Sequence, residues 1–439
     1  MRNSLYIKIL RLGFPILIGQ LGSIVVGFAD TAMVGRYATE ALASASFVNN
    51  VFNVVIFATL GFAYGLTPLI GALFSQKRYG RIGALMRSAV AANVLFALLV
   101  SAIMGAVYLN IDRLGQPEEL LPLIRPYFLI VLSGLIPLAL FNTFAQWSYA
   151  INRTRMPMWI ILAANALNIL GNYLLIYGNW GCPELGLNGA GIATLTARLV
   201  CAVAIILIFM YRRHYREYSD GFRKSRISWS DVLMVGKASW PVSAQMTFES
   251  GSFTVAAVMA GWIGSIALAA FQVTVMLGTL GFCVYYSLAA AVAVLVSNAA
   301  GLSDRPLMRW TAMSGYVILM LFATCSSLIF WMFGADVIRV FTHDAEVLAL
   351  GMTLIVPLMM YQYGDATQIT FANSLRGTAN VMPMMWISFV SYIVVGIPAT
   401  YILGFTAGLG LYGILLSFSV SLFLAGGLFL YCFIHTTRR

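Results

Sequence analysis

Long apolar runs dominate the chain, and their length indicates the class of protein. A helix needs about 20 mostly apolar residues to cross a bilayer. Twelve runs of this kind are present, and each predicts one transmembrane helix. They cover residues 12–35, 46–71, 85–109, 124–146, 157–178, 188–211, 237–261, 266–296, 311–333, 346–370, 383–405 and 410–434. The pattern therefore predicts an all-α polytopic membrane protein.

Composition supports this class and excludes others. Hydrophobic residues make up 61% of the 439 residues and charged residues only 9%, whereas soluble domains carry about 25% charged residues. A soluble fold would lack the charge to cover its surface, and a disordered chain would be less hydrophobic. A transmembrane β-barrel would show short alternating segments. The first run is too long for the core of a signal peptide and carries Asp30 near its end, so we expect it to be a helix of the protein.

Basic residues gather on one side of the predicted membrane. The formal net charge is +11. When the loops are assigned to alternate sides, 21 Lys and Arg residues fall on the side of the N-terminus and 4 on the other. The positive-inside rule then places both termini in the cytoplasm, with the protein in the plasma membrane, the inner membrane of a bacterium. The rule also accounts for the positive charge without a nucleic-acid partner.

The two halves of the chain resemble each other. The matching segments, at shifts of 224 to 226 residues, are Phe14-Pro15 with Trp240-Pro241, Met156-Pro157-Met158 with Met382-Pro383-Met384, and Gly186-Leu187-x-Gly189 with Gly410-Leu411-x-Gly413. We therefore predict two pseudo-symmetric six-helix bundles, residues 1–211 and 237–439, joined by a cytoplasmic basic linker, 212–236. Each bundle has an even number of helices, so both enter the membrane in the same sense, as in transporters built from parallel repeats.

Three acidic residues, Asp30, Glu249 and Asp365, fall inside predicted helices. An ionised side chain at the bilayer centre costs about 2.5–3.5 kcal/mol on insertion scales, so such residues face a cavity or a partner. At the twin positions, 226 residues away, stand the uncharged residues Ala256, Ser23 and Ala139. The shared scaffold therefore does not need these acids, which favours a chemical role. A hydrogen bond that packs helices together, or a buried pair with Arg198, is the structural alternative.

Neutral oxygen donors accompany these acids. Asn168 and Asn172 are four residues apart, so they share one face of a helix, and Thr194 lies near the start of the next helix. Tyr361 precedes Asp365 by one helical turn. Hard cations prefer several oxygen ligands. Two sets could hold Na⁺, namely Asp30 with Asn168, Asn172 and Thr194, or Glu249 with Asp365 and Tyr361. Packing between helices is the alternative role for the asparagines.

The same acids could instead carry H⁺, because burial favours the neutral form of a carboxyl group. Glu249 and Asp365 could then titrate as a coupled pair. The residues leave Na⁺ and H⁺ both open as the coupling ion, and we expect no other cofactor. Either ion would compete with a cationic substrate at Asp30, Glu249 and Asp365. Such exclusion is the simplest chemical basis of antiport.

These features resemble the MATE family, the multidrug and toxic compound extrusion transporters, in its NorM-like branch. The resemblance covers essentially the whole chain. Its most specific stretches are Pro15 with Ala29-Asp30-Thr31-Ala32-Met33-Val34-Gly35, Asn168-x-x-x-Asn172-Tyr173, Gly189-x-Gly191-x-Ala193-Thr194, Asp365-Ala-x-Gln368 and Leu375-Arg376-Gly377. The resemblance implies that Asp30 is the acid of the first lobe, that Asn168, Asn172 and Thr194 are its partners, and that Glu249, Asp365 and Tyr361 form the site of the second. Some relatives carry an acid where Asn172 stands, so a cation site here would have one negative charge fewer.

The resemblance implies a monomeric antiporter that exports organic cations against Na⁺ or H⁺ by alternating access, within membrane lipid. A lipid-linked saccharide flippase of the related superfamily is the alternative. A flippase would need several intramembrane arginines to hold pyrophosphate, and only Arg198 lies inside a predicted helix. We do not expect an enzyme, because His214, His343 and His435 lie in loops or the tail and neither HExxH nor GxxxxGK[ST] occurs. The spacing of the five cysteines predicts no disulfide framework and no zinc site.

Overall fold

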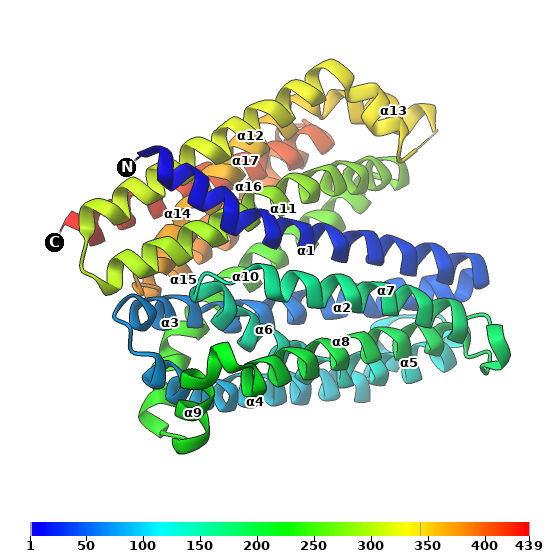
Figure 1. The fold of residues 1–439 in the computed structure, drawn as a ribbon. Coiled ribbons are helices and arrows are strands. Elements are labelled where there is room, and N and C mark those ends of the chain that lie inside the picture. The colour runs from blue at the N-terminus through cyan, green and yellow to red at the C-terminus, as the bar shows by residue number, and fades with distance from the viewer. Residues whose placement is uncertain (1, 343, 439) are drawn as a thin grey trace. The chain divides into compact units, whose positions relative to one another are not determined.

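The computed structural model describes residues 2–342 and 344–438. Three residues lie outside the described part, namely Met1, His343 and Arg439. The predicted loop position of His343 and the predicted cytoplasmic position of Arg439 therefore fall outside it. Regular structure in the described part of the chain is helical throughout (Figure 1). The predicted all-α class is therefore confirmed.

The first half of the chain contains eight α-helices and short 3₁₀ turns. The α-helices are α1 (Arg2–Tyr37), α2 (Thr39–Tyr64), α3 (Leu66–Ser75), α4 (Tyr79–Leu109), α5 (Leu121–Ser133), α6 (Leu135–Ala150), α7 (Arg155–Leu175) and α8 (Gly186–Tyr211). The 3₁₀ turns are Ile111–Leu114, Glu118–Leu120 and Asn179–Gly181. Two of the predicted helices are each broken into two pieces, at Gly65 between α2 and α3 and at Gly134 between α5 and α6.

The second half begins after a 3₁₀ turn, Arg213–Tyr215, and a short helix, α9 (Arg216–Lys224). Its helices are α10 (Trp229–Ile263), α11 (Ser265–Gly301), α12 (Arg305–Arg339), α13 (Ala345–Thr353), α14 (Ile355–Gly377), α15 (Met382–Ser388), α16 (Ile397–Tyr401) and α17 (Gly410–Arg438). Two π-helical segments, Phe389–Gly396 and Ile402–Thr406, flank α16. The predicted helix 383–405 is thus a composite of α and π turns.

Ten helical segments of the described chain are long and apolar enough to cross a membrane, and an eleventh arises when α13 and α14, bent by 52°, are taken together. These segments account for eleven of the twelve predicted spans. The remaining one, 237–261, corresponds to α10 and is outside this set. Polar residues lower the hydropathy of α10, and they include Gln245, Thr247, Glu249, Ser250 and Ser252. Charged and polar side chains of this kind are rare in membrane helices and mark functional positions.

The chain forms two compact units by its internal contacts. Residues 18–243 form one, which we call the N-unit, and residues 1–17 with 244–439 form the other, the C-unit. Helices α1 and α10 therefore contribute residues to both. The lobes 1–211 and 237–439 are predicted from the sequence repeat, whereas these units are defined by contacts between residues. The lobes therefore remain a prediction.

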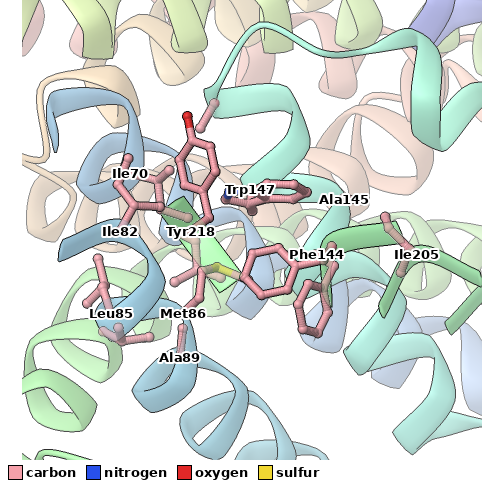
Figure 2. Packing of buried hydrophobic residues seen from close by; sticks show 14 of the residues in the cluster. Ile70, Ile82, Leu85, Met86, Ala89, Phe144, Ala145, Trp147, Ile205 and Tyr218 are labelled. Carbon is pink, nitrogen blue, oxygen red and sulfur yellow. The ribbon is translucent and has the colours of Figure 1, made fainter. Parts of the chain in front are cut away.

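The basic segment 212–236 is a packed part of the N-unit. Trp147 of α6 is fully buried, and its ring meets those of Phe209, Tyr215 and Tyr218 at centroid distances of 4.7, 4.9 and 5.6 Å. Ile82, Leu85 and Met86 of α4 belong to the same apolar cluster (Figure 2). Burial raises the pKa of the Tyr218 phenol above its ordinary value. The predicted linker is therefore anchored by aromatic side chains that lie among its basic residues.

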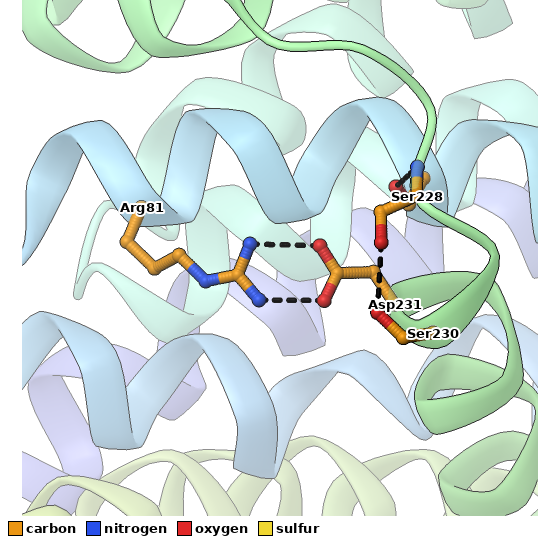
Figure 3. A network of polar contacts seen from close by, with 5 residues as sticks. Arg81, Ser228, Ser230 and Asp231 are labelled. Carbon is orange, nitrogen blue, oxygen red and sulfur yellow. Dashed lines mark hydrogen bonds and ion pairs between the residues drawn. The ribbon is translucent and has the colours of Figure 1, made fainter.

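An ion pair fixes the end of this segment to α4 (Figure 3). Arg81 donates to Asp231 through both terminal guanidinium nitrogens, at 2.7 and 2.5 Å. Asp231 is buried, whereas the Arg81 side chain is 39% exposed. The backbone N–H of Ser228 donates to Ser88 Oγ at 3.1 Å, which adds a second link to α4. The start of α10 is thereby held in a defined position.

The sequence repeat is matched by a repeat of packing at the starts of α8 and α17. Gly186 and Gly410 have φ angles of +53° and +57°, a left-handed conformation that favours glycine. A Cβ at Gly189 would collide with the carbonyl oxygen of Leu175, and a Cβ at Gly413 with that of Leu403. The same backbone contact therefore needs glycine in both halves, which supports the predicted duplication.

Candidate functional site

The predicted polar cluster of the first half is assembled in the N-unit. Asn172 of α7 donates through Nδ2 to Asp30 of α1 and, at 3.2 Å, to Asn168 Oδ1. Asn168 in turn donates through Nδ2 to Thr194 Oγ1 of α8 at 3.1 Å. Both asparagines are buried, and Asp30 and Thr194 are partly buried. The structure therefore brings these four predicted residues into one hydrogen-bonded chain, while their role remains a prediction.

Small residues between α7 and α8 make this contact possible. A Cβ at Gly171 would lie 3.0 Å from the Cβ of Ala193. Glycine at position 189 similarly lets α8 approach the carbonyl of Leu175. Close approach of two helix backbones at small residues is common in membrane proteins. It brings Thr194, one residue after Ala193, within hydrogen-bond distance of Asn168.

A cavity of about 190 Å³ lies beside Asp30 within the N-unit. Its lining includes Asn49 of α2, Tyr127 of α5, Thr194 and Arg198 of α8. Arg198 interacts electrostatically with Asp30 and Tyr127, but no ion pair of 4 Å or less joins it to a carboxylate in the described chain. Sequence reasoning offered a buried pair of Asp30 and Arg198 as the structural alternative, and no such pair occurs among the described residues. It missed Asn49 and Tyr127, because neutral side chains in apolar runs give no signal.

The oxygen atoms of this cluster fit a hard cation only in part. The Oδ1 atom of Asn172 is buried and has no hydrogen-bond partner in the described chain, so it is available as a ligand together with Asp30 and Thr194. Oxygen donors of this kind suit Na⁺. The nearby guanidinium of Arg198 opposes a second positive charge. The oxygen donors therefore suit a cation, whereas the positive charge of Arg198 beside them does not.

The second pair of predicted acids lies in the C-unit. Glu249 of α10 is partly buried and is hydrogen-bonded to the side chains of Gln245 and Gln368. Asp365 of α14 is 1% exposed and interacts electrostatically with Glu249. Its Oδ2 atom has no hydrogen-bond partner in the described residues. A buried polar atom without a partner is costly, so this oxygen is a candidate position for a proton or a cation.

Two tyrosines complete the acid cluster of the C-unit. Tyr361, predicted from its spacing, interacts electrostatically with both acids and packs edge-on against Phe253 at 6.3 Å. Tyr392 was missed by sequence reasoning. It is 1% exposed, interacts electrostatically with Glu249 and Asp365, and its hydroxyl has no hydrogen-bond partner in the described residues. Tyr392 lies in the π segment Phe389–Gly396, and no residue pattern predicts where a π turn replaces an α turn.

Among the described residues, ion pairs do not involve the three acids of the predicted helices. Four ion pairs occur in the described chain, and they join Arg81 to Asp231, Arg125 to Asp112, Arg216 to Asp220 and Arg339 to Asp336. None contains Asp30, Glu249 or Asp365. Asp30 belongs to the N-unit, and the other two acids belong to the C-unit. Each unit therefore carries its own acidic cluster, and no ion pair of the described residues neutralises either cluster.

Comparison with known proteins agrees with these features. The family model described as MatE matches twice, over residues 15–174 and 241–402, and the two matches begin 226 residues apart, the shift of the repeat. A probable multidrug resistance protein NorM of Bradyrhizobium diazoefficiens is 28% identical over 99% of this chain and 94% of its own.

Solved structures show the same fold. A MATE in complex with MaL6 has a TM-score of 0.89 at 17% identity and covers 99% of this chain and 97% of its own. The eukaryotic MATE transporter AtDTX14 also has a TM-score of 0.89, at 16% identity, and covers 100% of this chain and 98% of its own. The fold, the duplicated match and the curated relatives lead to one conclusion. This chain is an integral membrane protein that belongs to the MatE family, in its NorM-like branch.

Proposed function

We propose that this protein is a multidrug exporter that couples the outward movement of organic cations to the inward movement of Na⁺ or H⁺ by alternating access. It acts in the plasma membrane, the inner membrane of a bacterium, with both termini in the cytoplasm. The observation that carries the proposal is the pair of acids in the C-unit, Glu249 and Asp365. They interact electrostatically, and no ion pair among the described residues includes either of them. The naming of the Bradyrhizobium relative supports the efflux role.

The chemistry of exchange follows from the different surroundings of the two acids. Amides of Gln245 and Gln368 stabilise the carboxylate of Glu249, since hydrogen bonds to a charged acceptor are the strong ones. Asp365 keeps an oxygen without a partner. A coupling ion on this oxygen lowers the negative charge of the pair, and an organic cation needs that charge. Ion and substrate therefore bind one at a time.

Tyrosines and aromatic neighbours suit an organic cation at the same place. The ring of Phe253 stacks on that of Phe418 at 4.4 Å and contacts Tyr361 edge-on. Aromatic faces attract cations. Sodium would use the carboxylate oxygens and the tyrosine hydroxyl, whereas a proton needs only Asp365 Oδ2. Both ions suit these oxygen atoms, so a transport experiment has to distinguish between them.

A flippase has less support. A pyrophosphate group needs several basic side chains, and Arg198 alone among the arginines lines the cavity of the N-unit.

Transport of ethidium by purified protein in liposomes tests the proposal. A Na⁺ gradient is imposed on one sample of the vesicles and a H⁺ gradient on another. We expect one gradient to drive ethidium movement and the other to have little effect. Transport that is independent of both gradients would contradict coupling, and absence of ethidium movement under both would contradict the exporter.

A further inference from the structure

Another pocket of the N-unit, which we call the arginine pocket, has a volume of about 820 Å³. Its lining comes from the last turn of α3, the start of α4, the loop after α6 and the segment after α8. Membrane-spanning segments end at Ser75, Ala150 and Tyr211 and begin at Tyr79. The pocket therefore lies at the surface of the membrane. The side chains of its lining that carry a charge or an imidazole are Arg153, Arg213, His214, Arg216, Glu217 and Asp220.

The charges of the arginine pocket are only partly balanced. Arg216 pairs with Asp220, with 3.7 Å between Nε and Oδ2, so these two charges offset each other. The ion pairs of the described residues include neither Arg153 nor Arg213, and they do not include Glu217. Two guanidinium groups therefore face a single unpaired carboxylate, and the lining keeps a positive charge that suits an anion.

The contact between Arg153 and His214 adds no negative charge. A terminal nitrogen of Arg153 lies 3.0 Å from Nε2 of His214. A guanidinium carries only hydrogen-bond donors, so Nε2 is the acceptor and the imidazole is neutral in this arrangement. His214 therefore satisfies one donor of Arg153 without compensating its charge. An anion that enters the pocket can compensate it.

We propose that the arginine pocket binds the phosphate group of an anionic phospholipid headgroup, with Arg153 and Arg213 donating to the phosphate oxygens. Guanidinium groups bind phosphate through paired, charge-assisted hydrogen bonds, and basic pockets between membrane helices bind lipid headgroups. Tyr79 and Tyr218 belong to the same lining, and tyrosine is enriched where a protein crosses the membrane surface. The inference goes beyond the proposed export of cations, because it assigns an anionic lipid to a separate pocket.

Lipid binding to the purified full-length protein in detergent tests the proposal, with native mass spectrometry used to count each bound lipid. The probe is dioleoyl-phosphatidylglycerol. Dioleoyl-phosphatidylcholine has the same acyl chains and a headgroup without net charge. We expect the first phosphatidylglycerol to bind at least about tenfold more tightly than the first phosphatidylcholine, because two arginines near the membrane surface each favour an anionic lipid. Equal affinities for the two lipids would overturn the proposal.

A soluble phosphate ester is the other source of the same chemistry. Glycerophosphoglycerol has the headgroup of phosphatidylglycerol without its acyl chains. We expect it to bind at least about tenfold more weakly than the lipid, because it lacks the apolar contacts of the chains. Equal or tighter binding of glycerophosphoglycerol would overturn the assignment to a lipid. No ion gradient is imposed in these measurements, so failure of ion-driven efflux would leave their result standing.

Matched variants separate a built site from general positive charge. The double variant Arg153→Gln/Arg213→Gln should lower the affinity for phosphatidylglycerol at least about tenfold. The control, Arg212→Gln/Arg226→Gln, removes the same charge from the same basic segment but from residues outside the lining, and we expect less than about a twofold change. Glu217→Gln should raise the affinity, which a misfolded protein would not do. Equal losses in the two double variants, or unchanged affinity in the first, would overturn the proposal.

Discussion

At the scale of single residues, the two acids of the C-unit differ in what surrounds them. Glu249 is held by two glutamine amides, and Asp365 retains an oxygen without a partner. Buried polar atoms usually have a hydrogen-bond partner. Among the atoms of the described residues that lack one, Asp365 Oδ2 is the carboxylate oxygen. The hydroxyl of Tyr392 likewise has no hydrogen-bond partner in the described chain.

Glu249→Gln and Asp365→Asn should each abolish ion-driven ethidium efflux, with at least about a tenfold loss of rate. Each substitution keeps the shape of the side chain and removes the charge that both ion and substrate require. Drug resistance of cells, vesicle transport and the amount of protein in the membrane are measured together. Asp336→Asn is the control, because Asp336 is an exposed acid of the same unit. Wild-type resistance in either site variant would refute the role of these acids.

Asp30→Asn should impair ion or substrate handling less completely. Asp30 has Arg198 as an electrostatic neighbour, so its negative charge is already partly balanced. We expect a reduced rate of ion-driven transport in vesicles at a fixed ethidium concentration. A rate equal to that of the wild type would restrict the coupling site to the C-unit.

At the scale of helices, apolar runs and glycines explain most of the architecture. The predicted spans correspond to helices of the structure, and glycines at equivalent positions allow the same close contacts in both halves. Gly189→Ala and Gly413→Ala should each lower the stability of the protein by about 1–3 kcal/mol, because the added methyl group meets a backbone carbonyl that cannot rotate away. Thermal unfolding in detergent measures the change. The control is Gly427→Ala, since a Cβ there has open space around it. Equal unfolding temperatures for all three variants would contradict the packing repeat.

The ion pair between α4 and α10 gives an asymmetric prediction. Arg81→Met leaves the buried carboxylate of Asp231 without its partner, whereas Asp231→Asn leaves a guanidinium that can turn to solvent. An unpaired buried charge is the more costly of the two. Arg81→Met should therefore lower the free energy of unfolding by about 1–2 kcal/mol more than Asp231→Asn does. It should also give the lower unfolding temperature of the two. Equal destabilisation by the two variants, or a larger effect of Asp231→Asn, would show that burial of the carboxylate does not control the pair.

Sequence reasoning reached the helices and the hydrogen-bonded cluster of Asp30, but several features lay beyond it. The π segments depend on which carbonyl each N–H selects. The break at Gly134, by contrast, lies three residues before Pro137, which has no N–H to donate, so the sequence does carry a signal for it. The segment 212–236 resembles a solvated linker because of its charge, although Tyr215 and Tyr218 anchor it. Neutral site residues such as Tyr127 give no signal, since an uncharged side chain in an apolar run carries little cost.

At the scale of the whole molecule, the duplicated chain yields two units with unlike chemistry. The acidic cluster of the C-unit contains two carboxylates, Glu249 and Asp365, which no ion pair of the described residues includes, whereas the cluster of the N-unit contains Asp30 with Arg198 nearby. The MatE family model matches each half of the chain, and the two halves differ in a few polar residues. Under the proposed function, alternating access would use the similarity of the halves, and ion coupling would use the difference between their polar residues.

Competition between ion and substrate tests the central claim most directly. Binding of ethidium to the purified protein is measured while Na⁺ and H⁺ concentrations are raised separately. We predict that the apparent Kd for ethidium increases in proportion to the concentration of the coupling ion, and that this dependence disappears in the double variant Glu249→Gln/Asp365→Asn. An ethidium Kd for the wild-type protein that is independent of both ions would contradict the account, because ion and substrate would then bind without excluding each other.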